Sequence, residues 1–280
     1  MYSLAIGADR GRSIGGVDDL FVHRTKIATN PGLPLNPLLV LKFWNLQLPL
    51  QVTSEAIEGR TFAKTLIMKI AIVSGDLLKK EIQVRPLRAG IDIEWAWVAQ
   101  VSDLEQHRDA SLYVDLDFTM DKDRIRQLSQ FLPAPVMVNS VVHTLREIGR
   151  PFIRINAWPG FLERSIHELV ATDENAALAI AALYEQLGWQ YRIVPDIPGM
   201  ISARILATII NEAYYTLQSA ISTAPEIDTA MKLGTNYPFG PFEWSERIGP
   251  SNIYHLLTVL NEKDSRYAPA EALRQLLKRR

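Results

Sequence analysis

The segment DIPGMISARILATIINEAYYTLQSA, residues 196–220, starts with a Pro-Gly turn and then continues without a glycine or proline. Asp196 is suited to cap a helix here, and Pro198 is suited to its first turn, where a missing N–H is tolerated. Apolar residues recur at every fourth position: Ile201, Ile205, Ile209 and Ala213. We predict a long helix reaching Ala220 that buries this stripe, either in its own core or against a second subunit.

Two motifs follow this segment and predict structure. Residues 226–234 read EIDTAMKLG, which predicts a helix from Pro225 to Leu233 that Gly234 ends. Residues 237–243 read YPFGPFE, and the Gly240-Pro241 pair predicts a rigid corner that lets the flanking phenylalanines pack inward. The tail from residue 251 predicts two more short helices.

Upstream of the long helix, strand and helix patterns alternate. Strands are predicted over 69–73, 91–99, 110–117, 135–139 and 152–155, with helices over 77–83 and 121–131. A further helix over 173–187, closed by Gly188, and a strand over 191–194 come next. This alternation is typical of the α/β class, with a mainly parallel sheet flanked by helices.

The chain divides into three parts by pattern. Residues 1–67 are often interrupted by Gly and Pro, residues 68–160 form an alternating α/β part, and residues 161–280 an all-α part. Met68 begins an apolar strand pattern. Two interpretations stay open: translation starts at Met68 and the preceding segment is an over-long gene prediction, or that segment is a loosely ordered extension.

Composition excludes several classes of function. The formal net charge is −1, so no general attraction to nucleic acid or an anionic membrane is expected. Cysteine is absent, which excludes disulfides and thiolate catalysis and fits a cytoplasmic location. The apolar runs are much shorter than the ~20 residues of a membrane-spanning helix. The 5 histidines lack metal-ligand spacing, so we predict no metal site.

Taken in order, residues 196–204, 211–213, 226–234 and 237–243 closely resemble the C-terminal domain of the 3-hydroxyacyl-CoA dehydrogenase family. Residues 110–168 follow the second half of that family's nucleotide-binding domain more weakly. The resemblance implies a Rossmann-like NAD-binding part, shortened here between residues 91 and 110, and an all-α domain that pairs with its copy in a homodimer. It also implies an acyl-CoA or small-molecule ligand and a role in fatty acid metabolism.

The turn that would bind the dinucleotide departs from the family's pattern. Such a turn needs glycines so that the backbone can approach the pyrophosphate. In register, the three glycine positions hold Ser74, Asp76 and Lys79. Gly75 is out of phase, and Asp76 would bring a carboxylate against the diphosphate. The acid expected after the second strand is also missing, with Asp103 slightly late. The resemblance implies NAD, but these residues predict that its usual binding is lost.

The catalytic positions implied by the resemblance are altered as well. The family's general-base His falls at Asn156, and the Glu that orients it at Glu168. An amide cannot accept the substrate's proton, and losing a general base typically costs ~10²- to 10⁴-fold in rate. The helper Asn of the long helix is Ala203 here. Asn139 is kept as a candidate cofactor-binding residue, but the hydroxyl expected two residues later is Val141.

Two histidines are candidate replacements for the base. His167 neighbours Glu168 in a predicted strand, so the two side chains should point to opposite faces. His143 follows Asn139 and remains a candidate base or a packing residue. Three hypotheses stay open: a pseudoenzyme that keeps a cleft and a dimer, an active NAD-dependent oxidoreductase with atypical residues, or an interaction subunit that pairs with an active relative.

Overall fold

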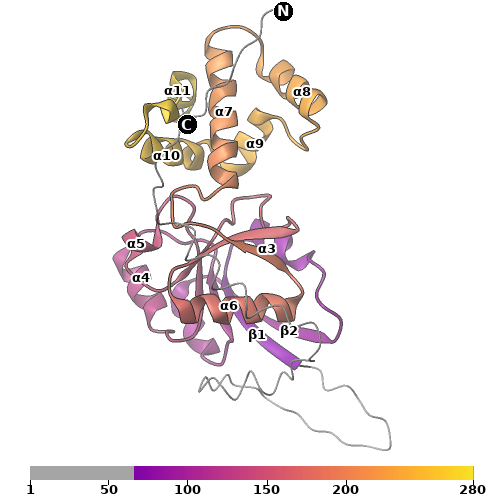
Figure 1. Cartoon of the computed structure of the whole chain (residues 1–280), viewed down its shortest axis with the longest axis vertical. Helices are drawn as coiled ribbons and strands as arrows, with labels where there is room; N and C mark the ends of the chain where they lie inside the picture. Colours follow the sequence, from indigo (N-terminus) through magenta and orange to yellow (C-terminus); the bar gives the residue numbers. More distant parts are fainter. Residues whose placement is uncertain (1–65, 280) are drawn as a thin grey trace, which may run out of the picture. The chain divides into compact units, whose positions relative to one another are not determined.

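The computed structural model describes residues 66–279, which form a seven-stranded sheet followed by a helical region (Figure 1). The strand order is β2-β1-β3-β4-β5-β6-β7. Neighbouring strands are parallel except β5 and β6, which are antiparallel. The strands are β1 Leu66–Val73, β2 Ile91–Val98, β3 Leu112–Asp115, β4 Val136–Asn139, β5 Ile153–Ile155, β6 Ile166–Ala171 and β7 Gln190–Ile193.

Helices connect the strands and then continue alone. Those of the sheet region are α3 Asp76–Gln83, the 3₁₀ helix η1 Val101–His107, α4 Lys122–Ser129, α5 Leu145–Ile148 and α6 Glu174–Leu187. Those of the helical region are α7 Ser202–Gln218, α8 Ala224–Thr235, α9 Pro241–Ile248, α10 Pro250–Asn261, η2 Ser265–Tyr267 and α11 Glu271–Arg279. The predicted α/β fold, a mainly parallel sheet followed by helices, is confirmed.

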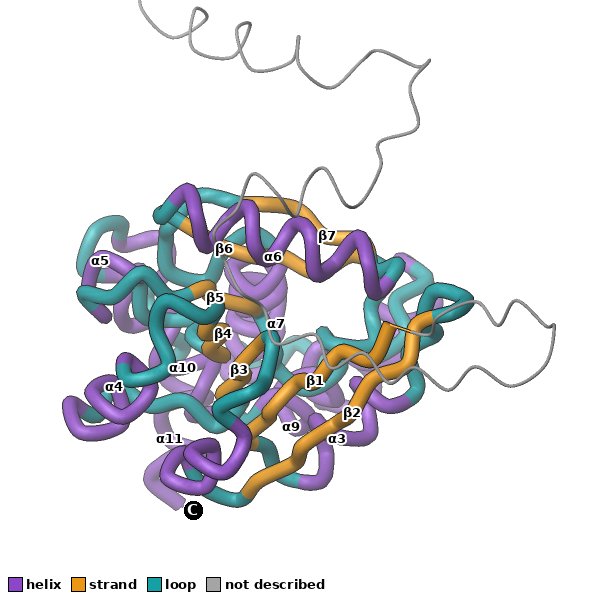
Figure 2. Tube along the Cα trace, turned by 90° about the horizontal axis from the view of Figure 1, so that it is seen from below, coloured by secondary structure: helices purple, strands orange, loops and turns teal. Residues whose placement is uncertain are grey.

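The sheet is covered on both faces, as the continuous apolar sequence of β1 requires. Ile70 and Ile72 enter a core that α3 and α6 complete. Ala71 and Val73 point the other way, into a core that η1, α4 and α5 share. Figure 2 shows α6 running along β6 and β7. The β2–β3 connection consists of η1 and short turns, which is the shortening expected between residues 91 and 110.

The helical region has its own core, and loops from the sheet region enter it. Helices α7, α9, α10 and α11 supply most of its side chains. Val141 and Val142, after β4, and Trp158 and Phe161, after β5, are buried in the same cluster. The segments that follow the carboxyl ends of β4 and β5 are therefore fixed by contacts with the helices.

The boundary expected at residue 160 requires correction. Residues 166–193 form β6, α6 and β7, which extend the sheet, and the helices after the sheet begin at Ser202. The chain doubles back after β5, and β6 pairs antiparallel with it, for example Ile155 with Leu169. The helical character of α6 masked this return in the sequence. The expectations for residues 1–65 lie outside the described residues, and β1 begins at Leu66, two positions before Met68.

Two helix ends differ from expectation. Helix α7 starts at Ser202, and Asp196 does not cap it but accepts from the first backbone N–H groups of α5. Gly234 lies inside α8, which continues to Thr235 and is closed by Asn236 with φ 56°. Asparagine tolerates this left-handed conformation, so the glycine was not needed at the end of the helix.

The first and last strands of the order are linked by aromatic contacts. Trp95 of β2 stacks on Trp97, with ring centroids 6.0 Å apart, and on Trp189, which precedes β7, at 6.4 Å. The Trp189 indole N–H donates to the Pro86 carbonyl, and the Arg88 N–H donates to the Leu187 carbonyl. The sheet is thus curved enough for the segment before β2 to contact the segment before β7.

Candidate functional site

The carboxyl ends of parallel strands are where α/β proteins bind ligands, so this edge of the sheet is the candidate site. Asn139, at the end of β4, connects its neighbours there. Its amide nitrogen donates to the carbonyls of Leu116 and Ala157 at 3.0 and 3.4 Å. Its amide oxygen accepts from the Ala157 N–H at 3.1 Å. Asn139 thus joins the ends of β3 and β5, and both ends of its side chain are bonded to protein.

Asn156 follows β5 directly and is 3% exposed. Its amide oxygen accepts from the Trp158 N–H at 3.3 Å, and its amide nitrogen has no partner among the described residues. Its backbone N–H donates to the Glu168 carbonyl at 3.4 Å. The side chain therefore offers one buried donor and no group able to accept a proton at neutral pH.

Glu168, on β6, is beside Asn156 in the ladder, but its carboxylate is bonded elsewhere. Its oxygens accept from the Ile201 N–H at 3.3 Å and from the Ser202 N–H at 3.0 and 3.2 Å. These N–H groups lie at the start of α7, where a carboxylate also interacts favourably with the helix dipole. Glu168 caps the long helix, a role that sequence reasoning gave to Asp196.

The two histidines considered as bases lie in different places. His167 is 3% exposed, bonded to the Tyr184 hydroxyl at 2.9 Å and the Leu162 carbonyl at 2.8 Å. Burial lowers the pKa of His167 to about 4. It points away from Glu168, as the strand alternation predicts. Its contacts are those of a neutral, structural imidazole.

His143 lies in the loop after β4, and its ring is 5.3 Å from that of His255 on α10. Glu147 is 4.0 Å from its Nδ1 atom. Burial, and then His255, lower the pKa of His143. The structure gives it no contact with Asn156 or Glu168, so the three candidate catalytic residues do not form one hydrogen-bonded group.

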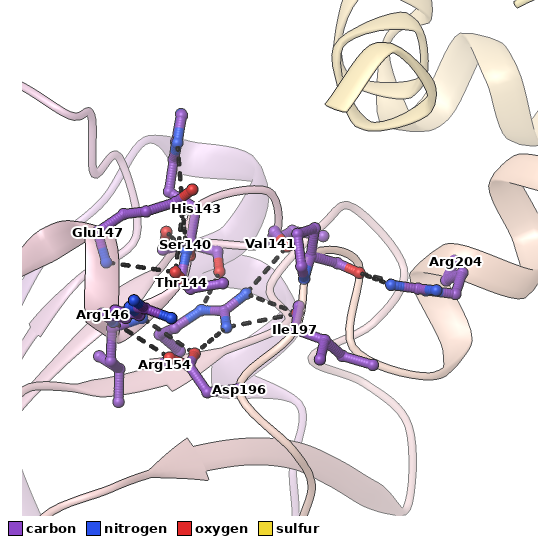
Figure 3. Close-up of polar contacts among 12 residues, drawn as sticks. Ser140, Val141, His143, Thr144, Arg146, Glu147, Arg154, Asp196, Ile197 and Arg204 are labelled. Carbon is purple, nitrogen blue, oxygen red and sulfur yellow. Dashed lines mark hydrogen bonds and ion pairs between the residues drawn. The ribbon is translucent and has the colours of Figure 1, made fainter. Parts of the chain in front are cut away.

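A buried ion pair that the sequence did not reveal lies next to these residues (Figure 3). Arg154 of β5 is 0% exposed and pairs with Asp196 at 2.5 Å. Its guanidinium also donates to the carbonyls of Ser140 and Val141 at 2.7 and 3.0 Å. Burial lowers the pKa of Arg154, and the bond to Asp196 opposes that effect. Asp196 also caps α5, so this pair ties β4, β5, α5 and the segment before α7 together.

The β1–α3 turn has the strand-turn-helix form but not the fit for a diphosphate. Gly75 caps α3 with φ −70°, and a Cβ there would meet nothing within 4 Å. The glycine is thus required neither by its conformation nor by close packing. Asp76 is exposed in the first turn, and the Ser74 hydroxyl donates to the Gly75 carbonyl. Lys79 lies 5.3 Å over the Trp97 ring.

The acids near this turn also have structural partners. Asp103, considered for the ribose, accepts from the Gln100 N–H at 3.3 Å and so caps η1. Glu81, near the end of α3, accepts from the N–H groups of Gly160 and Leu162 at 2.6 and 3.2 Å. Burial raises the pKa of Glu81. It anchors α3 to the loop after β5 with no ligand involved.

The apolar residues predicted to form one buried stripe on the long helix do not all lie on its buried face. Ile201 and Ile205 are 48% and 56% exposed, whereas Ala213 is buried. The buried face is instead set one position further on, at Leu206, Ala207 and Ile210. Ala203, in the helper Asn position, is 0% exposed and is part of the helical core.

Within residues 66–279 no three His, Cys, Asp or Glu side chains gather as a metal site would require. In the same range no helix is long and apolar enough to cross a bilayer.

Comparisons with known proteins support the resemblance predicted from the motifs. Residues 199–280 match the family model described as 3-hydroxyacyl-CoA dehydrogenase, C-terminal domain. The 3-hydroxyadipyl-CoA dehydrogenase of Escherichia coli (strain K12) is 28% identical over 253 residues, 87% of this chain and 51% of that protein. A probable 3-hydroxybutyryl-CoA dehydrogenase of Bacillus subtilis (strain 168) is 38% identical over 111 residues, 39% of each protein. The chain spans about half, or less, of these relatives.

Two solved structures have a similar fold. The (S)-3-hydroxybutyryl-CoA dehydrogenase of Ralstonia eutropha superposes with a TM-score of 0.53 at 25% identity, covering 68% of this chain and 70% of that one. The FadB2 protein of M. tuberculosis gives a TM-score of 0.55 at 18% identity, covering 66% and 70%. The second likeness concerns the fold alone.

Proposed function

Because this chain is a relative of the 3-hydroxyacyl-CoA dehydrogenase family and carries its C-terminal domain, we propose that it is a pseudoenzyme of that family, with the fold kept and the hydride-transfer chemistry lost. The observation that carries this proposal is that the side chains of the neighbouring residues Asn156 and Glu168 bond different groups and not each other. The first bonds the Trp158 N–H and the second caps α7, so they do not act as a base and its orienting acid.

The β1–α3 turn supports the same proposal. NAD binding in the family's manner would bring a diphosphate to the N-terminus of α3, where Asp76 lies in the first turn. Like charges would repel there, and no glycine-dependent backbone approach is available. Loss of the base and loss of the diphosphate turn are independent changes that both remove the reaction.

Titration with NADH tests the cofactor half of the proposal. We expect no quenching of the indole fluorescence and no energy transfer to the nicotinamide at millimolar NADH. A saturable signal would contradict the loss of NAD binding and would favour an active oxidoreductase with atypical residues.

Replacement of the amide by the family's base tests the catalytic half. We expect that neither the wild-type protein nor Asn156→His reduces acetoacetyl-CoA with NADH above a blank without protein. A general base alone contributes ~10²- to 10⁴-fold to the reaction rate. It can do so only when the cofactor is bound. Asn156→Gln is the matched control for the change in side-chain size. Turnover by the wild-type protein would overturn the proposal, and turnover only in Asn156→His would show an intact cleft.

A second candidate is an interaction subunit that pairs through the long helix, either with its copy or with an active relative. The exposed Ile201 and Ile205 favour it, because apolar side chains on a helix are usually covered. Recovery of only self-copies in a pull-down from native extract would restrict the pairing to a homodimer.

A further inference from the structure

Strand β7 ends the sheet, and its outer edge pairs with nothing among residues 66–279. Val194 donates its N–H to the Leu169 carbonyl of β6. Because successive residues of a strand turn their backbone groups to opposite sides, Arg192 and Gln190 also face β6. Tyr191 and Ile193 therefore direct their N–H and C=O groups outward. These outward groups are a template on which a further strand can be added.

Exposed apolar side chains lie beside this edge, together with the polar Gln190 and Arg192. Ile166 and Ile193 are 41% and 48% exposed. A depression of about 380 Å³ lies along the strand, lined by Ile166, Trp189, Gln190, Tyr191 and Arg192. The Arg192 guanidinium has no ion-pair partner in the described part of the chain. The edge lacks the proline or bulge by which many proteins prevent edge pairing.

Helix α6 adds apolar surface next to the same edge. It covers β7, with the ring of Tyr184 5.3 Å from that of Tyr191. Its outer side carries Leu178, which is 46% exposed, among several alanines. A strand of the same fold added to β7 would bring its own covering helix alongside α6. Leu178 lies opposite the buried Ile180 and Leu183, so it faces away from the sheet.

The sequence of β7 fits a copy of itself in one register. When two antiparallel copies are centred on Tyr191, the two tyrosines are opposite each other and exchange both backbone hydrogen bonds. Gln190 is then opposite the partner's Arg192, and Trp189 is opposite the partner's Ile193. No like charges meet, whereas a register centred on Arg192 would oppose two guanidinium groups. The exposed Ile193 is covered by an indole in this register.

We infer that β7 pairs antiparallel with β7 of a second copy of this chain, centred on Tyr191, so that two sheets join into one. This interface differs from the long-helix face and does not depend on the proposed function. It is also separate from the β1–α3 turn, because β7 lies at one end of the strand order and β1 is next to the other end.

Because the chain has no cysteine, a single introduced thiol tests the register directly. Opposed residues of a hydrogen-bonded antiparallel pair have Cα atoms about 5.5 Å apart, which a disulfide spans. We expect Tyr191→Cys to form a covalent dimer at least tenfold faster than Leu77→Cys under mild oxidation. Leu77 is a matched control, since it is 56% exposed on α3. Equal rates for the two variants would overturn the inference. Ile205→Cys reports separately on the long-helix face.

The molar mass of the protein in solution provides a second test, in which Tyr191 is kept. In the Ile205→Glu background, which removes pairing through α7, we expect a dimer at high protein concentration. Adding Ile193→Glu should shift that dimer to monomer, because a carboxylate would face the partner's indole. Adding Leu77→Glu should leave the dimer unchanged. A monomer in the Ile205→Glu background at every concentration would contradict the inference, while the proposed function would be unaffected.

Discussion

The sheet region, residues 66–193, buries the carboxylate of Asp115, the guanidinium of Arg154 and the imidazole of His167. The helical region, residues 202–279, buries small caps such as Asn211 and Asp228 within an otherwise apolar core. Both regions carry the family resemblance. In the helical region, the motif residues make structural contacts. In the sheet region lie the positions that, by the family resemblance, would hold the catalytic and cofactor-binding residues.

The residues of the helical motifs make contacts that hold the fold together. Asn211 bonds the Ala268 carbonyl and the Ala270 N–H, both at 2.8 Å, and so fixes the segment before α11. A Cβ on Gly240 would overlap Asp228, which caps α9 through the Phe242 N–H at 2.8 Å. These contacts are needed for folding whatever the protein binds. In the sheet region, the side chains of Glu168 and Asn139 likewise bond backbone groups of neighbouring segments.

The largest expected effect concerns the buried ion pair between Arg154 and Asp196. Asp196→Ala should lower the free energy of unfolding by ~3–5 kcal/mol, because it leaves the fully buried Arg154 without its counter-charge. Asp173→Ala is the matched control, since that carboxylate only caps α6, and it should cost ~1 kcal/mol. Urea denaturation measures both. Equal losses would mean that the Arg154 charge is well solvated and would remove the contrast between the two regions.

The next largest effect is the loss of stability that protonation of His167 causes at acidic pH. Burial lowers the pKa of His167 from its ordinary value of 6.5 to about 4 in the folded chain. As the pH falls, the unfolded chain therefore protonates His167 before the folded chain does. The contribution of the neutral His167 to the free energy of unfolding is complete above pH 6.5 and is lost as the pH falls toward 4. The expected loss is ~3 kcal/mol at the low end. Glu81, whose pKa is raised by burial, acts in the opposite direction.

Urea denaturation of His167→Phe across that pH range isolates this contribution. The variant should be less stable at neutral pH, because the Tyr184 hydroxyl and the Leu162 carbonyl lose their partner, but its stability should fall less steeply in acid. An unchanged slope in His167→Phe would show that the acid sensitivity comes from other groups.

The smallest effect belongs to the helical region and has the opposite sign. Gly234 is in α8 with open space around its Cβ position, so Gly234→Ala should raise the free energy of unfolding by ~0.5–1 kcal/mol. Gly240→Ala, the contrasting glycine, should destabilise through its overlap with Asp228. A destabilised Gly234→Ala would indicate that this position is covered, for instance by a partner.

The elements predicted best from the sequence are those whose signals are local. The helix capped by Asp173 and closed by Gly188, and the opposite faces of His167 and Glu168, depend on residues within a few positions of each other. The end of α8 was misplaced because a glycine is not a sufficient stop signal: Gly234 lies inside the helix, and Asn236 closes it.

What the sequence could not give depends on contacts between distant segments. Asp196 is beside a suitable helix start, yet it caps α5, whose first N–H is 51 positions away. Glu168 caps α7 across 34 positions. The return of β6 into the sheet was missed for the same reason, because its register is set by β5 and not by its own pattern. The family resemblance located Asn156 and Glu168, but only the fold shows what their atoms bond.

The row of Trp97, Trp95 and Trp189 brings indoles from the two ends of the sheet within stacking distance. Closely spaced chromophores couple electronically, so the near-ultraviolet circular dichroism of this chain should contain a paired signal from this row. The Trp95–Trp189 part of that signal would vanish when the segments before β2 and β7 separate, whereas the Trp95–Trp97 part, which lies within β2, would remain. The circular dichroism of these tryptophans therefore reports whether the two ends of the curved sheet stay in contact.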